Sequence, residues 1–317
     1  MDKNKENWKG SREGFGEGLV KLGETNPKVV VLCCDLTNST RVEAFKKRFP
    51  DRFFQFGVAE QNMMAIAVGM SLTGYIPYVC TYGVFSAGRC WEQLRLSVCY
   101  TNCNVKVEGA HAGILVGPDG ASHQATEDIG AIRVIPNLKV VVPCDAIEAR
   151  KATIASADIP GPVYIRLGRE PIPIITTEET PFTLGKANIM REGKDVTVIA
   201  CGVEVSEALL AAEELEKEGI DVCVVDLHTI KPIDKETIVK LAKETGAVVT
   251  AEEHQVFGGL GGAVAEVLSQ EYPVPMEMVG IKDSFGVSGP PWELMKHFGL
   301  TSNNIKEAIK KVLSRKP

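Results

Sequence analysis

The feature that most constrains the fold of this chain is a regular alternation of short apolar runs with segments of helical periodicity. Residues 29–34 form a continuous apolar run, as expected of a strand buried on both faces of a sheet, and a helical pattern begins at Arg41. Comparable apolar runs occupy residues 75–81, 105–108, 139–143 and 163–167, with helical segments at 58–72 and 146–157. This alternation predicts an α/β fold in which crossover helices join parallel strands.

A second series of the same kind follows an interruption. Residues 170–181 contain three prolines and no helical period, so we interpret them as a linker. The second series predicts strands at 195–200, 221–226, 247–251 and 276–280, and helices at 204–218, 235–245, 262–271 and 304–313. We therefore expect one α/β domain over residues 1–180, including the linker from about 170, and a second domain over residues 181–317.

Charge and composition exclude several classes of protein. The chain has 35 basic and 41 acidic residues, whereas general nucleic-acid binders carry a basic surplus. No stretch approaches the roughly 18 apolar residues of a membrane-spanning helix, and residues 1–14 are too polar for a signal peptide. Nine cysteines, an odd number, favour a reducing compartment over a disulfide framework. We expect a soluble cytoplasmic protein that binds neither nucleic acid nor membrane.

Glu60 is the only charged residue in the apolar helical segment 58–72. A helix that is apolar on nearly all sides is a buried helix, and an unpaired carboxylate there is costly to ionise. One interpretation is a partly solvated glutamate that the helix dipole stabilises in the first turn. The other is an acid that faces a cleft and meets a ligand.

Two aromatic residues and a glycine-rich loop follow predicted strands. Tyr82 and Phe85 come after the strand that ends near residue 81, where open α/β sheets place ligand-binding loops. The loop after residue 108 gathers His111, Asp119 and His123 among glycines, which favours a ligand site over a merely structural turn. The alternative is that these polar side chains satisfy turn amides. The spacing is not that of a metal-binding histidine pair, so we predict no metal site.

Three single residues, Arg12, Ser39 and Arg169, lie beside predicted strand ends or loops. Each alone is best explained as a surface or capping residue, but together they could bind a phosphate through guanidinium and hydroxyl donors. The glycines at 258–262 follow a strand and precede a helix, yet their register fails the dinucleotide-binding pattern. We interpret them as a close contact between helix and strand.

In combination, these segments resemble the C-terminal half of transketolase. Gly-Val-Ala-Glu60-Gln-Asn-Met resembles the family's sequence around its activating glutamate, and Thr81-Tyr-Gly-Val-Phe85 resembles the family's aromatic pocket. Gly117-Pro-Asp-Gly-Ala-Ser-His-Gln is similar to the family loop G-x-D-G-P-T-H-Q, and Arg133-Val-Ile-Pro-Asn is similar to the segment after it. Cys34-Asp-Leu-Thr-Asn-Ser39 and Tyr164-Ile-Arg-Leu-Gly-Arg169 occupy the expected places. The resemblance covers almost the whole chain.

This resemblance implies two three-layer α/β/α domains with mostly parallel sheets, a pyrimidine-binding domain followed by a transketolase C-terminal domain. It implies that Glu60 contacts the aminopyrimidine of thiamine diphosphate as the activating acid, with Phe85 stacked on this ring and Tyr82 beside it. The substrate-binding residues that it implies are His123 and Asp119 for the sugar hydroxyl and carbonyl groups, with His123 also catalytic, and His111, Arg12, Ser39 and Arg169 for the sugar phosphate. One departure is Gly88, where many members have a third aromatic residue.

A larger departure concerns the diphosphate of the cofactor. Family members bind it through Mg²⁺ with a Gly-Asp-Gly signature followed by an asparagine, and this sequence contains no Gly-Asp-Gly. The resemblance therefore implies a companion polypeptide, the N-terminal transketolase subunit, which carries that motif and binds Mg²⁺ (or Ca²⁺). We expect self-association of the pair into a heterotetramer.

The implied reaction is transfer of a two-carbon ketol unit from a ketose phosphate to an aldose phosphate, as in the pentose phosphate pathway. Two alternatives lie within the thiamine enzymes. A 1-deoxyxylulose 5-phosphate synthase shares the D-G-x-x-H-Q loop, and the beta subunit of a 2-oxoacid dehydrogenase has a similar length but different loop residues. An alternative from another class is a non-catalytic paralogue, against which the presence of Glu60, Asp119 and His123 argues.

Overall fold

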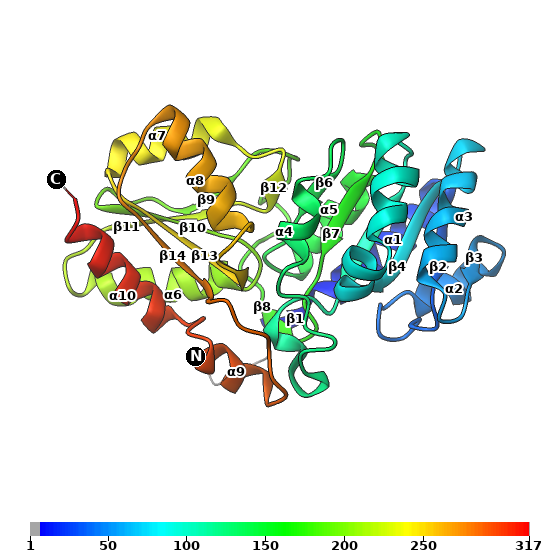
Figure 1. Cartoon of the computed structure of the whole chain (residues 1–317), viewed down its shortest axis with the longest axis horizontal. Helices are drawn as coiled ribbons and strands as arrows, with labels where there is room; N and C mark the ends of the chain where they lie inside the picture. The colour runs from blue at the N-terminus through cyan, green and yellow to red at the C-terminus, as the bar shows by residue number, and fades with distance from the viewer. Residues whose placement is uncertain (1–6, 317) are drawn as a thin grey trace.

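The computed structural model describes residues 7–316 of the chain. Residues 1–6, which belong to the segment judged too polar for a signal peptide, lie outside the described part. Figure 1 shows two α/β halves side by side, with most of the N-terminal half in blue to green and the C-terminal half in yellow-green to red.

The first half is built on a seven-stranded sheet in the order β12-β6-β7-β5-β4-β2-β3. Its strands are β2 (Val29–Cys33), β3 (Phe53–Gln55), β4 (Ile76–Tyr82), β5 (Lys106–Ala110), β6 (Lys139–Val141), β7 (Val163–Arg166) and β12 (Thr229–Lys231). All neighbours are parallel except β12 and β6. Every residue of β2, β4 and β5 is buried, as the continuous apolar runs predict.

Helices cover both faces of this sheet. They are α1 (Ser11–Thr25), α2 (Glu43–Arg48), α3 (Glu60–Leu72), α4 (Asp128–Arg133) and α5 (Ala146–Ser156), with the short helices η2 (Pro50–Arg52) and η5 (Ile114–Asp119) and the π-helical segments η3 (Val84–Arg89) and η4 (Gln93–Tyr100). Phe15 of α1 and Ala149 of α5 belong to the cluster of buried residues on one face. Met63 of α3 and Leu94 of η4 belong to the cluster on the opposite face.

The second half repeats this architecture on a smaller scale. Its five-stranded sheet has the order β14-β13-β10-β11-β9, and its strands are β9 (Asn188–Arg191), β10 (Val196–Ala200), β11 (Val222–Asp226), β13 (Val248–Gln255) and β14 (Met276–Ile281). The helices are α6 (Glu204–Glu216), α7 (Lys235–Thr245), α8 (Leu260–Glu271), α9 (Pro291–His297) and α10 (Ser302–Leu313). Buried residues of α6 and α10 contact one face, and those of α7 and α8 contact the other. The predicted α/β/α layers are thus confirmed.

Two connections differ from the sequence-based expectation. The segment predicted as a featureless linker contains β8 (Pro171–Pro173), which pairs antiparallel with β1 (Trp8–Gly10). In addition, β12 leaves the second half and adds an edge strand to the first sheet. The division near residue 180 stays a prediction, and β12 shows that the two halves share a sheet.

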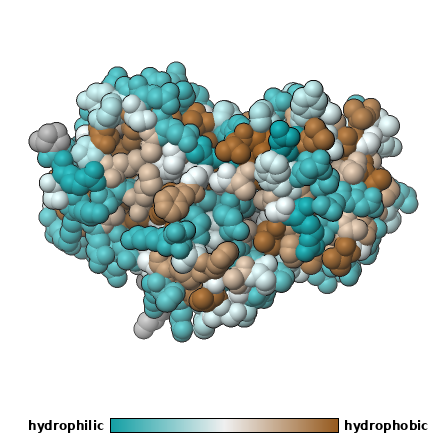
Figure 2. Space-filling model, viewed as in Figure 1, coloured by the Kyte–Doolittle hydropathy of each residue, from teal (hydrophilic) through white to brown (hydrophobic). Residues whose placement is uncertain are grey.

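The surface and the cysteines add two observations. Figure 2 shows a largely hydrophilic face whose outline is notched between the two halves, with hydrophobic groups near the notch. All nine cysteines are free and buried. Within residues 7–316, no helix combines the length and the apolar character that crossing a membrane requires.

Candidate active site

The residues singled out from the sequence gather at one edge of the first sheet. The parallel strands β2, β4, β5 and β7 end at this edge, so the loops after them are neighbours. Ser39 follows β2, Tyr82 is the last residue of β4, His111 follows β5 and Arg169 follows β7. Glu60 reaches the same region as the first residue of α3. The order of the strands therefore explains why positions distant in sequence come together.

Four rings form an aromatic cluster at this edge. The rings of Tyr82 and His111 are stacked with centroids 3.9 Å apart, and those of Tyr82 and Phe85 are stacked at 5.7 Å. His123 meets the Phe85 ring edge-on at 5.6 Å. Tyr82 and His111 are buried, whereas Phe85 and His123 are half-buried. The cluster offers partly accessible ring faces to a flat ligand.

Glu60 is buried, with a relative exposure of 2%. This burial contradicts the interpretation of a partly solvated first-turn acid. Its Oε2 accepts a hydrogen bond of 2.8 Å from Nη1 of Arg89, the last residue of η3. Sequence reasoning missed this partner, because Arg89 resembles an ordinary exposed helix arginine.

Arg12 lies at the same edge and links two of its loops. It is buried, and Nε donates to the carbonyl oxygen of Gly168 at 3.2 Å. Its terminal nitrogens donate to the carbonyl oxygens of Ser39 and Arg169. Burial, with help from Arg41, lowers the pKa of Arg12 to about 10, so the guanidinium remains charged at neutral pH. Arg12 thus ties the two loops together and adds positive charge.

His111 contributes a neutral ring to the same cluster. Burial first, and then the charge of Arg12, lowers the pKa of His111 to about 2. Its Nδ1 is buried and has no hydrogen-bond partner among residues 7–316. An imidazole with an unused polar atom is suited to a ligand group that the chain itself does not supply.

Asp119 and Arg169, both predicted to contact sugar, face each other. Arg169 Nη1 lies 3.2 Å from Asp119 Oδ1, and it also donates to the carbonyl oxygen of Val116. His123 Nδ1 lies 2.9 Å from Ser122 Oγ. The structure therefore brings all nine predicted site residues to one region, and their roles stay predictions.

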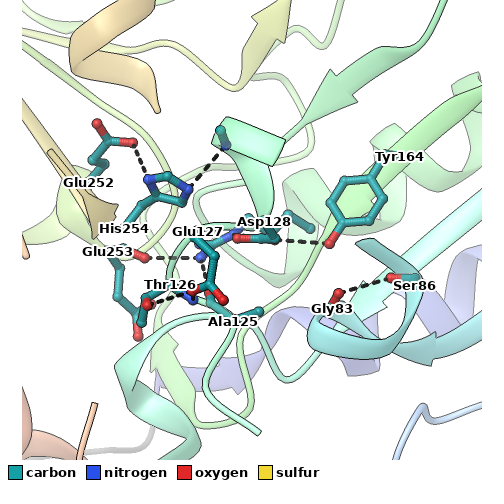
Figure 3. Close-up of polar contacts among 12 residues, drawn as sticks. Gly83, Ser86, Ala125, Thr126, Glu127, Asp128, Tyr164, Glu252, Glu253 and His254 are labelled. Carbon is teal, nitrogen blue, oxygen red and sulfur yellow. Dashed lines mark hydrogen bonds and ion pairs between the residues drawn. The ribbon is translucent and has the colours of Figure 1, made fainter. Parts of the chain in front are cut away.

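A buried polar network holds the loop that carries Asp119 and His123, and sequence reasoning missed it (Figure 3). Tyr164 Oη donates to Asp128 Oδ2 at 2.9 Å, and Arg166 Nε contacts the same oxygen at 2.9 Å. Arg166 Nη2 reaches the carbonyl oxygens of Ala125 and Glu253, at 2.9 and 3.0 Å. A buried Arg–Asp pair with satisfied donors fixes geometry, so this network positions the loop between the two halves. The available signal was a charged residue inside the apolar run 163–167.

The glycine-rich segment at 258–262 is occupied by the chain itself. The carboxylate of Glu252 accepts hydrogen bonds from the backbone nitrogens of Leu260 and Gly261, at 2.7 and 2.8 Å. A Cβ at position 259 would lie 2.1 Å from Glu252 Oε2. The first turn of α8 therefore holds an internal anion where a phosphate would bind, which supports the packing interpretation.

Comparisons with known proteins identify the family to which this fold belongs. Residues 9–173 match the family model described as transketolase, pyrimidine binding domain, and residues 185–305 match transketolase, C-terminal domain. A relative from Methanocaldococcus jannaschii, provisionally named a transketolase C-terminal section, is 46% identical over 95% of this chain and 96% of its own length. A 6-deoxy-6-sulfo-D-fructose transketolase subunit from Clostridium sp. (strain MSTE9) is 41% identical over 99% of this chain and 97% of its own length.

A solved structure shows the same fold. It is described as a split gene transketolase in an inactive beta4 tetramer, and it matches with a TM-score of 0.92 and 49% identity, over 97% of this chain and 99% of that chain. Family models, relatives and structure agree over almost the whole sequence. The chain belongs to the transketolase family, in which it corresponds to the C-terminal section of the split-gene members.

Proposed function

We propose that this chain is the C-terminal subunit of a thiamine-diphosphate-dependent transketolase. Together with an N-terminal subunit that binds the cofactor's diphosphate through Mg²⁺ (or Ca²⁺), it transfers a two-carbon ketol unit from a ketose phosphate to an aldose phosphate. The observation that carries the proposal is that buried Glu60 and half-buried Phe85 both lie against the side chain of Arg89, at the same sheet edge as Arg12 and Arg169.

The residues fit the aminopyrimidine ring of the cofactor. Glu60 offers a carboxylate oxygen at the start of an apolar helix, and Phe85 offers a half-buried aromatic face. A Cβ at Gly88 would meet no atom within 4 Å, so the side of the pocket without a third aromatic residue is open. When bound, thiamine diphosphate supplies the electron sink for cleaving the carbon–carbon bond beside a carbonyl. Glu60 holds a proton at a ring nitrogen, and Phe85 fixes the plane of the ring.

The neighbouring polar residues fit a phosphorylated sugar. Arg12 and Arg169 provide positive charge, and His111 provides a neutral ring whose Nδ1 lacks a partner within the described chain. His123 meets the Phe85 ring edge-on and Asp119 pairs with Arg169, so both are placed to bind the sugar hydroxyl and carbonyl groups. The Clostridium relative is named for a sulfonated sugar, and a sulfonate group, like a phosphate group, is a tetrahedral anion. We propose phosphate as the anion for this chain.

The surface supports a companion subunit. Several large hydrophobic side chains are exposed on α3, on η4 and in the turn between α3 and β4: Ile66 42%, Leu72 74%, Tyr75 45%, Leu96 46% and Tyr100 81%. Contiguous exposed apolar residues on a helix that is apolar all round are typical of a protein interface. We propose that the N-terminal subunit covers this side and that pairs associate into a heterotetramer. Free, buried cysteines are consistent with the reducing cytoplasm as the place of action.

The experiment is a reconstitution of the two subunits with thiamine diphosphate and Mg²⁺. Turnover is measured with a ketose phosphate and an aldose phosphate, and in parallel with pyruvate as donor. Glu60→Gln keeps the size and an acceptor oxygen but cannot hold the proton, so kcat is expected to fall about 100-fold or more. Glu236→Gln is the matched control, because Glu236 is also a first-turn glutamate, on α7, and is exposed.

Three outcomes contradict the proposal. Wild-type turnover of Glu60→Gln at saturating cofactor removes the role of the acid. Faster turnover with pyruvate than with the ketose phosphate favours a synthase or oxoacid dehydrogenase. If the wild-type pair binds thiamine diphosphate but turns over none of these substrates, the chain is a non-catalytic paralogue.

A further inference from the structure

Arg89 occupies an unusual position in the candidate active site. Its Nη1 donates to Glu60 Oε2 at 2.8 Å, while its Cζ lies 4.3 Å from the centroid of the Phe85 ring. One guanidinium thus contacts both the buried acid and the aromatic face. These are the two groups of this chain that the proposed function assigns to the aminopyrimidine.

The chemistry of these two contacts is that of a bound ring. A guanidinium is flat and delocalised, it donates N–H groups in its plane to a carboxylate, and it stacks on aromatic faces. An aminopyrimidine held by Glu60 and Phe85 presents a ring nitrogen to the carboxylate and a flat face to the phenyl ring. Two flat groups cannot share one face of Phe85 and one oxygen of Glu60.

We propose that Arg89 is an internal stand-in for the aminopyrimidine: it pairs with Glu60 and covers Phe85 in the cofactor-free chain, and the cofactor displaces it. This inference rests on the proposed function, since it concerns the same site. It explains how the chain keeps a buried carboxylate paired before the cofactor arrives.

The surroundings of Arg89 leave its side chain free to move away from Glu60 and Phe85. The side chain is 45% exposed, whereas that of Glu60 is 2% exposed, so the arginine is the partner that can leave. Position 88 beside it has open space, because a Cβ there would meet no atom within 4 Å. The Gln61 Nε2 amide donates to the backbone carbonyl oxygen of Arg89 at 3.1 Å, which ties the backbone to α3. Displacement therefore requires a change of side-chain rotamer and not of the fold.

A stand-in lowers the apparent affinity for the ring, because only the fraction of molecules with a displaced arginine can bind. The test is a calorimetric titration of the two-subunit protein with thiamine diphosphate at saturating Mg²⁺, which gives the Kd for the cofactor. Arg89→Met keeps the length of the side chain and removes the charge and the flat donor. We expect its Kd to be about 10-fold lower than that of the wild type.

The matched control is Arg95→Met. Arg95 is the next arginine along the chain, and its guanidinium lies over the Trp91 ring at 5.8 Å without an ion pair to Glu60. We expect its Kd to stay within about twofold of the wild-type value. A third variant, Arg89→Ala, leaves a gap that methylguanidinium fills, and adding this cation is expected to return the Kd toward the wild-type value.

The outcomes separate this inference from the proposed function. If wild type and Arg89→Met bind thiamine diphosphate with the same Kd, or if the variant binds more weakly while its melting temperature is unchanged, Arg89 is no stand-in and the proposed function stands. If Arg89→Met unfolds, the response of Arg89→Ala to methylguanidinium decides, and no response overturns the inference. If no form binds the cofactor, both proposals fail.

Discussion

Glu253 is a buried carboxyl that joins the second half of the chain to the candidate active site, and its replacement by glutamine tests that junction. It lies on β13, and its Oε1 accepts a hydrogen bond of 2.6 Å from the backbone nitrogen of Leu115 in η5, the short helix that ends at Asp119. Removal from water raises the pKa of Glu253 to about 7, although Arg166 opposes the shift.

The size of the effect follows from the two pKa values. The folded chain holds the proton of Glu253 up to about pH 7, whereas the ordinary value for the unfolded chain is 4.5. At about 1.4 kcal/mol for each unit of pKa, the protonated carboxyl contributes about 3 kcal/mol. Because the folded pKa is the higher one, this contribution is complete below pH 4.5 and is lost as the pH rises to about 7.

The assay is urea unfolding of wild type and Glu253→Gln at several values between about pH 4 and pH 8. Glutamine keeps the acceptor for Leu115 and does not titrate. As the pH rises from about 4 to 8, we expect the free energy of unfolding of wild type to fall by about 3 kcal/mol relative to that of Glu253→Gln. Glu236→Gln, at an exposed site on α7, is expected to show no such change. Parallel profiles for wild type and Glu253→Gln would refute the reasoning.

The remaining predictions concern a close contact and the proposed anion site. Gly109→Ala places a Cβ about 2.0 Å from the Tyr164 hydroxyl, so we expect the free energy of unfolding, measured in urea, to fall by about 2 kcal/mol or more. At Gly69, on α3, a Cβ would meet no atom within 4 Å, so we expect Gly69→Ala to stabilise the isolated chain by about 1 kcal/mol. Equal effects of the two substitutions contradict the packing argument. His111→Asn is expected to raise the KM for the phosphorylated sugar about 10-fold with little change in kcat. Because the pKa of His111 is lowered to about 2, the wild-type KM should show no step from this residue between about pH 5 and pH 8.

Five strands of the first sheet, β2, β4, β5, β6 and β7, could be predicted because they are local patterns. The run at 29–34 needs only neighbouring residues to be recognised as a strand buried on both faces. By contrast, β12 has three residues and acquires its pairing from β6, almost 90 positions earlier. The pair β1 and β8 depends in the same way on a distant partner. Short edge strands carry too few residues for a periodic signal, so tertiary contacts decide them.

The site residues that could be predicted lie just after strands, where topology alone brings them together. Tyr82 and His111 are examples, because the parallel pairing of β4 and β5 places both at one edge. The partners of these residues could not be predicted. Arg89 contacts Glu60 only because the π-helical segment η3 sets the direction of its side chain, and nothing in the local sequence indicates a π-helix.

The charges of the site follow from burial more than from the number of ionisable groups. Glu108 lies on β5 opposite Cys80 of β4 and is fully buried, and this burial raises its pKa well above the ordinary value. Because burial disfavours the charged form of Glu108, this acid opposes the charge of Arg12 less than a solvated carboxylate would, and the pKa of Arg12 falls only to about 10. Asp119 pairs with Arg169, and burial lowers the pKa of His111 to about 2, so Arg12 remains as a buried positive charge at this edge of the sheet. Burial of this acid thus favours a net positive charge at the edge of the sheet where we propose that the sugar phosphate binds.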